Sequence, residues 1–126
     1  MTLERKKEIE EYIQDWFWDK KSHKFAFELA KYLFEFMDNM EENSNLSEST
    51  IRKHISNCWS IGILICQYGY YDVFSPKIFS YPPYNEIEFR RKFSDSKYQI
   101  QSYRSTCKKL EKYAIKQGDL SYKQED

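Results

Sequence analysis

The residues best suited to metal or acid–base chemistry are a histidine and a cysteine four positions apart, His54 and Cys58. On a helix, this spacing places both side chains on one face. A metal site needs three or four ligands, and the other candidates, His23, Cys66 and Cys107, stand at no ligand spacing from this pair. We therefore expect a polar histidine near a helix start and a core cysteine, with no metal site and no bound cofactor.

Nucleophilic catalysis by a cysteine needs an exposed thiolate and a third group that orients the base. Cys58, Cys66 and Cys107 fall on apolar stripes, which predicts buried thiols. Their odd number and the lack of a CxxC motif are typical of reduced cysteines in a cytoplasmic protein. The chain also lacks GxGxxG, GxxxxGKS/T, HExxH and GxSxG motifs. We therefore predict that the protein is not an enzyme.

The strongest charged pattern lies in residues 86–117, which hold nine basic and four acidic side chains. A basic helix face can follow the phosphates of a nucleic acid. The candidate contacts are Arg90, Arg91, Arg104, Lys108 and Lys112. The alternative is a solvated face that balances an acidic first part of the chain. Because the whole chain has a formal net charge of zero, we favour this alternative and rank nucleic-acid binding second.

A second candidate surface is aromatic. Trp18 lies off the apolar stripe of the first predicted helix, and several tyrosines crowd a segment with three prolines. Tryptophan and tyrosine are enriched at protein interfaces. The candidate protein contacts are Trp18, Tyr70, Tyr71, Tyr81 and Tyr84. The alternative is that these residues belong to an ordinary aromatic core.

The composition points to a helical protein with an aromatic-rich core. Aromatic residues make up 18% of the 126 residues, and the chain holds only three Gly and three Pro. Because Gly and Pro form turns and interrupt helices, such a low content favours a few long helices over many short strands. We predict an all-α fold, a compact bundle of four or five helices. Residues 1–118 form a single domain in this prediction, and 119–126 form a frayed polar tail.

The predicted bundle is organised around a buried central helix over about 47–68. Ser47 is its expected N-cap, with Leu46 and Ile51 at the positions of a hydrophobic staple. Gly62 lowers helix propensity by about 1 kcal/mol relative to Ala, which a close helix crossing would explain. The alternative is a buried strand over 60–66, because β-branched residues are common there.

The other expected elements follow from helical periods and turn residues. We expect helices over 2–20, 23–42, 86–93 and from 94–96 to 117, and an ordered Tyr/Pro-rich crossover over 69–85. In the crossover, Pro76 suits the first position of a single helical turn.

The string Leu46–His54, LSESTIRKH, resembles the start of the recognition helix in LuxR-type helix-turn-helix proteins. A helix-turn-helix has a short helix ending three or four residues earlier, whereas here a long helix and a polar linker precede the string. A similar order of long helix, polar loop and Ser-Thr start occurs in the core-binding domain of tyrosine recombinases. Neither likeness assigns a family.

No leader peptide and no membrane span is expected, because the first residues are charged and no apolar run reaches about eighteen residues. The sequence thus predicts a small cytoplasmic, non-catalytic binding or assembly protein. Its expected partner is an unidentified protein or a second copy of the chain. A nucleic-acid-binding accessory protein is the alternative.

Overall fold

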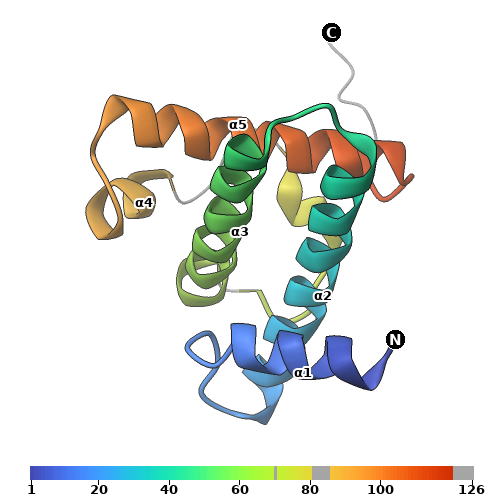
Figure 1. Ribbon diagram of the computed structural model, residues 1–126. Coiled ribbons are helices and arrows are strands. Elements are labelled where there is room, and N and C mark those ends of the chain that lie inside the picture. Colours follow the sequence, from blue (N-terminus) through green and yellow to red (C-terminus); the bar gives the residue numbers. More distant parts are fainter. Residues whose placement is uncertain (70, 81–85, 121–126) are drawn as a thin grey trace, which may run out of the picture. The chain divides into compact units, whose positions relative to one another are not determined.

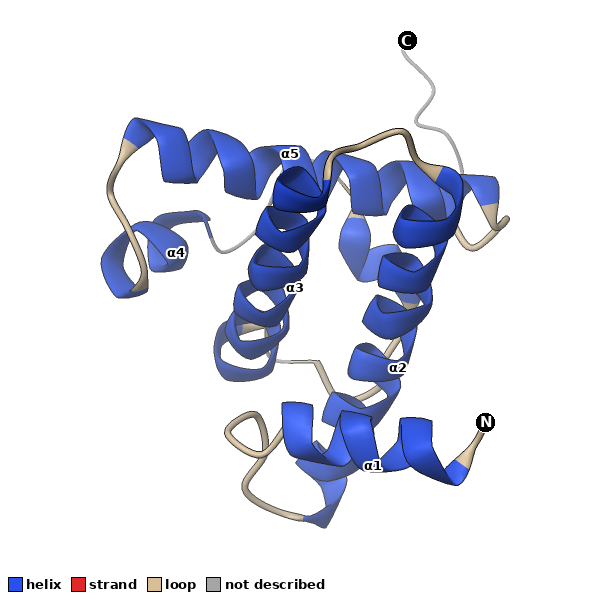
Figure 2. Cartoon of the chain, in the orientation of Figure 1, coloured by secondary structure: helices blue, strands red, loops and turns tan. Residues whose placement is uncertain are grey.

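The computed structural model describes residues 1–69, 71–80 and 86–120 (Figure 1). Within these ranges the backbone forms five α-helices and one short 3-10 helix, and no strand (Figure 2). In chain order the elements are α1 (Leu3–Tyr12), α2 (Lys20–Asn43), α3 (Glu48–Tyr68), η1 (Pro76–Phe79), α4 (Glu86–Lys92) and α5 (Lys97–Lys116). The all-α prediction is confirmed. The alternative of a strand over 60–66 is wrong, since these residues lie inside α3.

The backbone divides into two compact units, 1–74 and 75–126, and each is described by itself. Unit 1 contains α1, α2 and α3, and unit 2 contains η1, α4 and α5. A single domain over 1–118 stays a prediction. Of the expected polar tail, residues 121–126 lie outside the described ranges.

The central helix of the prediction is α3. Ser47 is its N-cap and accepts a hydrogen bond from the Thr50 N–H at 3.3 Å. In the second half of α3, apolar residues occupy all faces of the helix, and every residue from Ser60 to Ile65 is buried. A helix apolar on all sides requires cover on all sides, and the burial of α3 is therefore confirmed.

In unit 1, α2 runs beside α3 in the opposite direction (Figure 1). The helical period predicts a stripe on α2, and each member of it is buried: Ala26, Leu29, Ala30, Leu33, Phe36, Met37 and Met40. This stripe follows the i, i+3, i+4 spacing of a core-facing helix. Packing of α2 on α3 therefore uses the residues that the periodicity selects.

Helix α1 crosses α2 and is held at both ends by charged side chains (Figure 1). The Arg5 guanidinium lies 3.0 Å from the Asp38 carboxylate and stands over the ring of Phe34. Nearer its C-terminus, the Glu10 carboxylate lies 2.8 Å from Nε2 of His23. These contacts fix the direction in which α1 crosses.

The expected helix over 2–20 is wrong at its C-terminal end, because α1 stops at Tyr12. The chain turns after Ile13, and the Trp16 N–H donates to the Ile13 carbonyl at 2.8 Å. This turn buries both Ile13 and Trp16, which are 0% and 1% exposed. The free energy gained by burying these two large side chains after the turn outweighs the free energy that a longer α1 would contribute.

Helix α2 begins at Lys20, earlier than the expected start at residue 23, and Asp19 is its N-cap. The Asp19 carboxylate accepts from the Ser22 N–H at 2.7 Å, and the Ser22 hydroxyl accepts from the Asp19 N–H at 3.0 Å. This reciprocal pair is a capping box, which satisfies two N–H groups at the helix start.

In unit 2, α4 packs beside α5 through stacked rings. The centroids of Phe89 and Tyr103 are 4.2 Å apart, and their planes differ by 21°. Of the candidate caps for the last helix, Ser96 is the N-cap of α5. The predicted turn at Pro76 is confirmed as η1, with Ser75 as its N-cap.

Candidate functional site: an aromatic groove in unit 1

Unit 1 contains a groove lined by aromatic side chains. Its volume is about 360 Å³, and it is open to solvent along one side. The turn before α2, the start of α2, the end of α3 and the segment after α3 all contribute to it. Its lining residues are Trp16, Trp18, Asp19, Lys21, Ser22, Phe25, Ile65, Cys66, Gln67, Tyr71 and Asp72.

Trp18 forms one exposed wall of this groove. Its side chain is 72% exposed, which is unusual for the largest apolar residue. Its backbone is nevertheless fixed, since the Trp18 N–H donates to the Ser22 hydroxyl at 3.1 Å beside the capping box. A rigid backbone therefore presents a large aromatic side chain to solvent.

Tyr71 contributes a second aromatic side chain and is 41% exposed. Its ring is nearly parallel to that of Phe25, with centroids 6.2 Å apart and planes differing by 9°. The ring of Phe74 meets Phe25 edge-on at the same centroid distance. The segment that follows α3 is thus anchored to the start of α2 by aromatic packing.

The inner residues of the groove are apolar. Trp16 is 1% exposed, Ile65 is 1% exposed, and Cys66 has intermediate exposure. Burial raises the pKa of the Cys66 thiol to about 12, so at neutral pH this cysteine is protonated and a poor nucleophile. The inner surface is therefore suited to contact and not to covalent chemistry.

Charged groups occupy the edge of the groove. Asp72 and Lys21 form an ion pair of 3.2 Å whose side chains are 82% and 74% exposed. Hydrogen bonds from the Ser22 backbone and hydroxyl lower the pKa of Asp19, which keeps that carboxylate ionised. Two carboxylates against one cation give the groove a net negative charge.

Two of the five sequence-predicted protein contacts, Trp18 and Tyr71, come together in this groove although 53 positions separate them. The other three, Tyr70, Tyr81 and Tyr84, lie outside the described residues. Sequence reasoning missed the contribution of Phe25, which widens the apolar arc of α2 beyond one face. The wide apolar arc of α2 indicated that Phe25 packs against a further segment, but it did not indicate which segment.

The basic side chains of unit 2 form a different surface. Because α5 is continuous, Arg104, Lys108 and Lys112 lie along one helix face, and all three are exposed. Arg104 is paired through two nitrogens with the Glu86 carboxylate, and its Nη2 lies 2.9 Å from Oε2.

The two arginines predicted from α4 differ in their pairing. Arg90 Nε lies 3.2 Å from the Asp95 carboxylate. Arg91 is exposed on the same helix. Arg90 and Arg104, both candidate nucleic-acid contacts, are thus engaged in ion pairs within unit 2.

The histidine on α3 is more buried than expected, since His54 is only 4% exposed. Cys58 is buried, which confirms the predicted core cysteine. Within the described ranges, no group of three or more His, Cys, Asp or Glu side chains is arranged to hold a metal ion. Cys66 and Cys107 are less buried than predicted, with intermediate exposure.

No protein-family model, curated protein or solved structure matches this chain. In the part of the chain that the structure describes, none of the helices has both the length and the apolar character that crossing a bilayer requires.

Proposed function

We propose that this chain is a non-catalytic binding protein whose unit 1 groove holds a segment of a protein partner. The observation that supports this proposal is the exposure of Trp18 at the edge of a groove whose inner side chains are apolar. A volume of about 360 Å³ suits one or two side chains of a bound segment.

Aromatic side chains on a fixed backbone favour binding for a physical reason. Covering Trp18 removes a large apolar area from water, and the capping box at Asp19 has already ordered its backbone. Such residues dominate the free energy of association at many interfaces. The free cysteines fit a reducing compartment, so we place this activity in the cytoplasm.

The test is selection of peptides from a random library on the native chain, followed by titration against single variants. Trp18→Ala should weaken the selected peptides by at least about tenfold, as expected for a central aromatic contact. Tyr98→Ala is the matched control, because Tyr98 is 57% exposed but lies in unit 2. Peptides that bind Trp18→Ala as tightly as the native chain would contradict the proposal.

A second copy of the chain is another possible occupant of the groove. Sedimentation of the native chain over a range of concentrations separates these cases. A concentration-dependent mass that Trp18→Ala abolishes would replace the peptide partner by self-association. A constant monomer mass leaves the groove accessible for a different protein.

The second candidate function is nucleic-acid binding through the basic face of α5. The continuity of this helix favours it, because the basic side chains lie along one face. We rank it second because Arg90 and Arg104 already have carboxylate partners in unit 2. Its test is binding of labelled DNA and RNA at low and moderate salt, with Arg104→Glu/Lys108→Glu as the comparison. Salt-sensitive binding that the double variant abolishes would place this function first.

A further inference from the structure

We infer that the groove recognises a cationic side chain of the partner segment, with arginine preferred over lysine. This inference rests on the proposed function and names the chemistry of the residue that enters the groove. It follows from three features of unit 1: aromatic side chains in the groove, carboxylates at the groove edge, and a net negative charge of the whole unit.

The first feature is the aromatic lining. Trp18, Tyr71 and Phe25 all contribute to the groove, with Trp16 at its inner side. Aromatic rings attract cations through their quadrupole, most strongly in tryptophan. The planar guanidinium of arginine also stacks on rings, and it is less strongly hydrated than an ammonium group. Arginine therefore loses less hydration than lysine on entering such a groove.

The second feature is the ion pair between Lys21 and Asp72. This pair places a cation at the groove edge, with Nζ 3.2 Å from the carboxylate. Both side chains are largely exposed, so the pair is weak and can be exchanged. A guanidinium can bind Asp72 through two nitrogens, which a single ammonium cannot do.

An apolar occupant fits less well for the same reason. It would displace water from the exposed carboxylate of Asp72 without offering a donor in place of that water, and partial removal of an ionised group from water is unfavourable. A cation offers such a donor. The carboxylate of Asp72 therefore selects against a purely apolar side chain.

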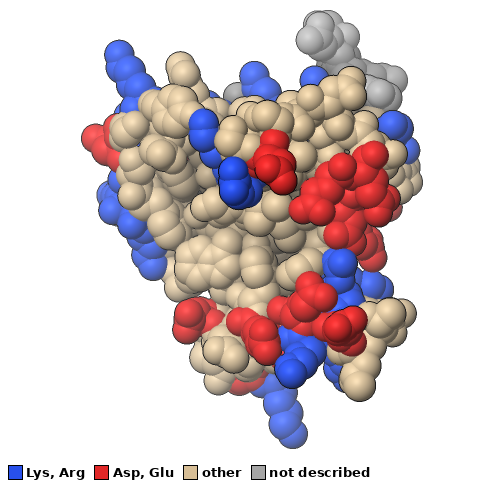
Figure 3. Space-filling view, in the orientation of Figure 1, with Lys and Arg blue, Asp and Glu red and all other residues tan. Residues whose placement is uncertain are grey.

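The third feature is the charge of the whole unit. Residues 1–74 hold nine Lys/Arg against thirteen Asp/Glu, a balance of −4. Figure 3 shows a red area of acidic side chains over the C-terminal half of α2, the half that contains Glu35, Asp38, Glu41 and Glu42 and that lies at the opposite end of this helix from the groove. Such a field attracts a basic segment before contact and raises its association rate.

The experiment titrates native protein, labelled with ¹⁵N, with four small probes followed through the indole N–H signals. The probes are the N-acetyl amides of arginine, citrulline, lysine and leucine. The chain has three tryptophans, so the signals are few and can be assigned by substitution. We expect the arginine probe to shift the Trp18 signal most and to bind about two- to fivefold more tightly than citrulline, its neutral analogue.

Two lysine variants provide the decisive comparison. Lys21→Ala removes the cation that competes for Asp72, and Lys20→Ala removes the same charge from a neighbouring residue outside the groove. We expect Lys21→Ala to strengthen binding of the arginine probe relative to Lys20→Ala. Equal affinities in the two variants would overturn the pairing with Asp72.

The failure of this inference can be distinguished from failure of the proposed function. A leucine probe that shifts Trp18 while arginine does not would overturn the cation inference and leave the groove as a binding site. Absence of any shift with arginine would also overturn the inference. Only library peptides that ignore Trp18→Ala would overturn the proposed function itself.

Discussion

The indole ring of Trp16 packs directly against the backbone of Gly62, in the middle of α3. A Cβ atom built on Gly62 would overlap Cη2, Cζ2 and Cζ3 of this ring. The glycine is therefore explained by the close approach of a side chain from the turn after α1, in place of the predicted helix crossing. Its absence of a side chain is what allows Trp16 to be buried.

Gly62→Ala should consequently destabilise the protein although alanine is the better helix former. Helix propensity favours alanine by about 1 kcal/mol, whereas forcing a methyl group into a packed core costs typically about 1–3 kcal/mol. We expect a net loss of up to about 2 kcal/mol in the free energy of unfolding, measured by urea denaturation. In a Trp16→Phe background the same change should cost less, and an undiminished cost would contradict the packing argument.

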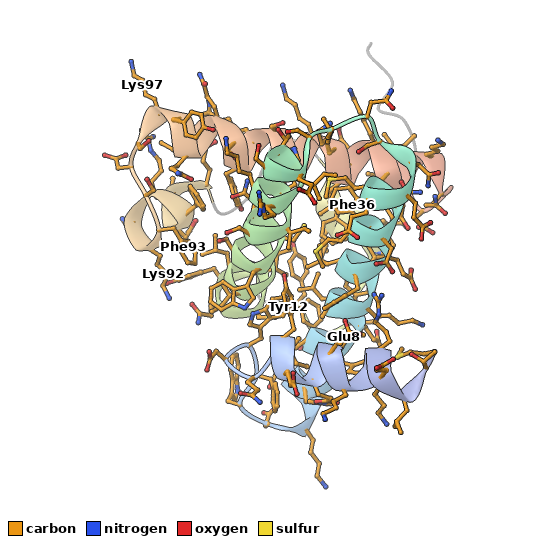
Figure 4. The ribbon with its side chains drawn as sticks, viewed as in Figure 1. Glu8, Tyr12, Phe36, Lys92, Phe93 and Lys97 are labelled. Carbon is orange, nitrogen blue, oxygen red and sulfur yellow. The ribbon has the colours of Figure 1, made fainter. Side chains whose placement is uncertain are left out.

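Tyr12 offers a substitution that should preserve or raise stability. Its side chain points from α1 toward the space between α2 and α3 (Figure 4), and its ring meets Phe34 edge-on at 5.1 Å. The hydroxyl is buried and makes no hydrogen bond to any described residue, and burial raises its pKa. Tyr12→Phe should therefore raise the free energy of unfolding by up to about 1 kcal/mol.

Tyr103 is the matched control for Tyr12. Its hydroxyl is also buried, but it interacts with the Cys107 thiol, and burial is the main cause that raises its pKa. Tyr103→Phe should lower the free energy of unfolding by about 0.5–1.5 kcal/mol, since it removes a hydrogen-bonding group with a partner. Equal effects of the two substitutions in chemical denaturation would show that hydrogen bonding does not distinguish these sites.

The pair of Glu86 and Arg104 predicts a pH dependence of stability in unit 2. The hydrogen bond from Arg104 lowers the pKa of Glu86 below its ordinary value. The unfolded chain therefore takes up the proton first, and the stabilisation, complete above the ordinary pKa, is lost as the pH falls through the folded pKa. Because both side chains are partly exposed, the total is below about 1 kcal/mol.

Glu86→Gln imitates the protonated state and tests this dependence. The native chain should be more stable than the variant at pH 7, and the difference should shrink toward zero as the pH falls below about 4. Asp95→Asn is the comparison, because its partner Arg90 is held by a single nitrogen in a more exposed pair. A native-minus-variant difference that stays constant with pH would exclude an ionised Glu86 as the cause.

Thiol reactivity provides a further prediction. Burial raises the pKa of both Cys66 and Cys107 to about 12. Alkylation by iodoacetamide requires the thiolate, so at pH 8 both thiols should react on the order of a thousandfold more slowly in the folded chain than in urea. Site-resolved mass spectrometry measures each rate. Rapid alkylation of either residue in the folded chain would contradict the raised pKa of its thiol.

Much of the secondary structure could be predicted from local patterns. The apolar period of α2, the Ser47 and Ser96 caps and the Pro76 turn all depend on residues within one or two turns of one another. The end of α1 could not be predicted in this way. It depends on Trp16 finding space beside Gly62, which lies 46 positions further along the chain.

The candidate site shows the same division. From the sequence alone, Trp18 was singled out by its place off the stripe of a predicted helix that in fact ends at Tyr12, and the tyrosines by their crowding in the segment after α3. Only the tertiary structure decided that Trp18 and Tyr71 line one groove with Phe25, with Asp72 at its edge. The physical reason is the range of the interactions: caps and periods act between near neighbours, whereas a groove requires α2 and α3 to bring distant residues together.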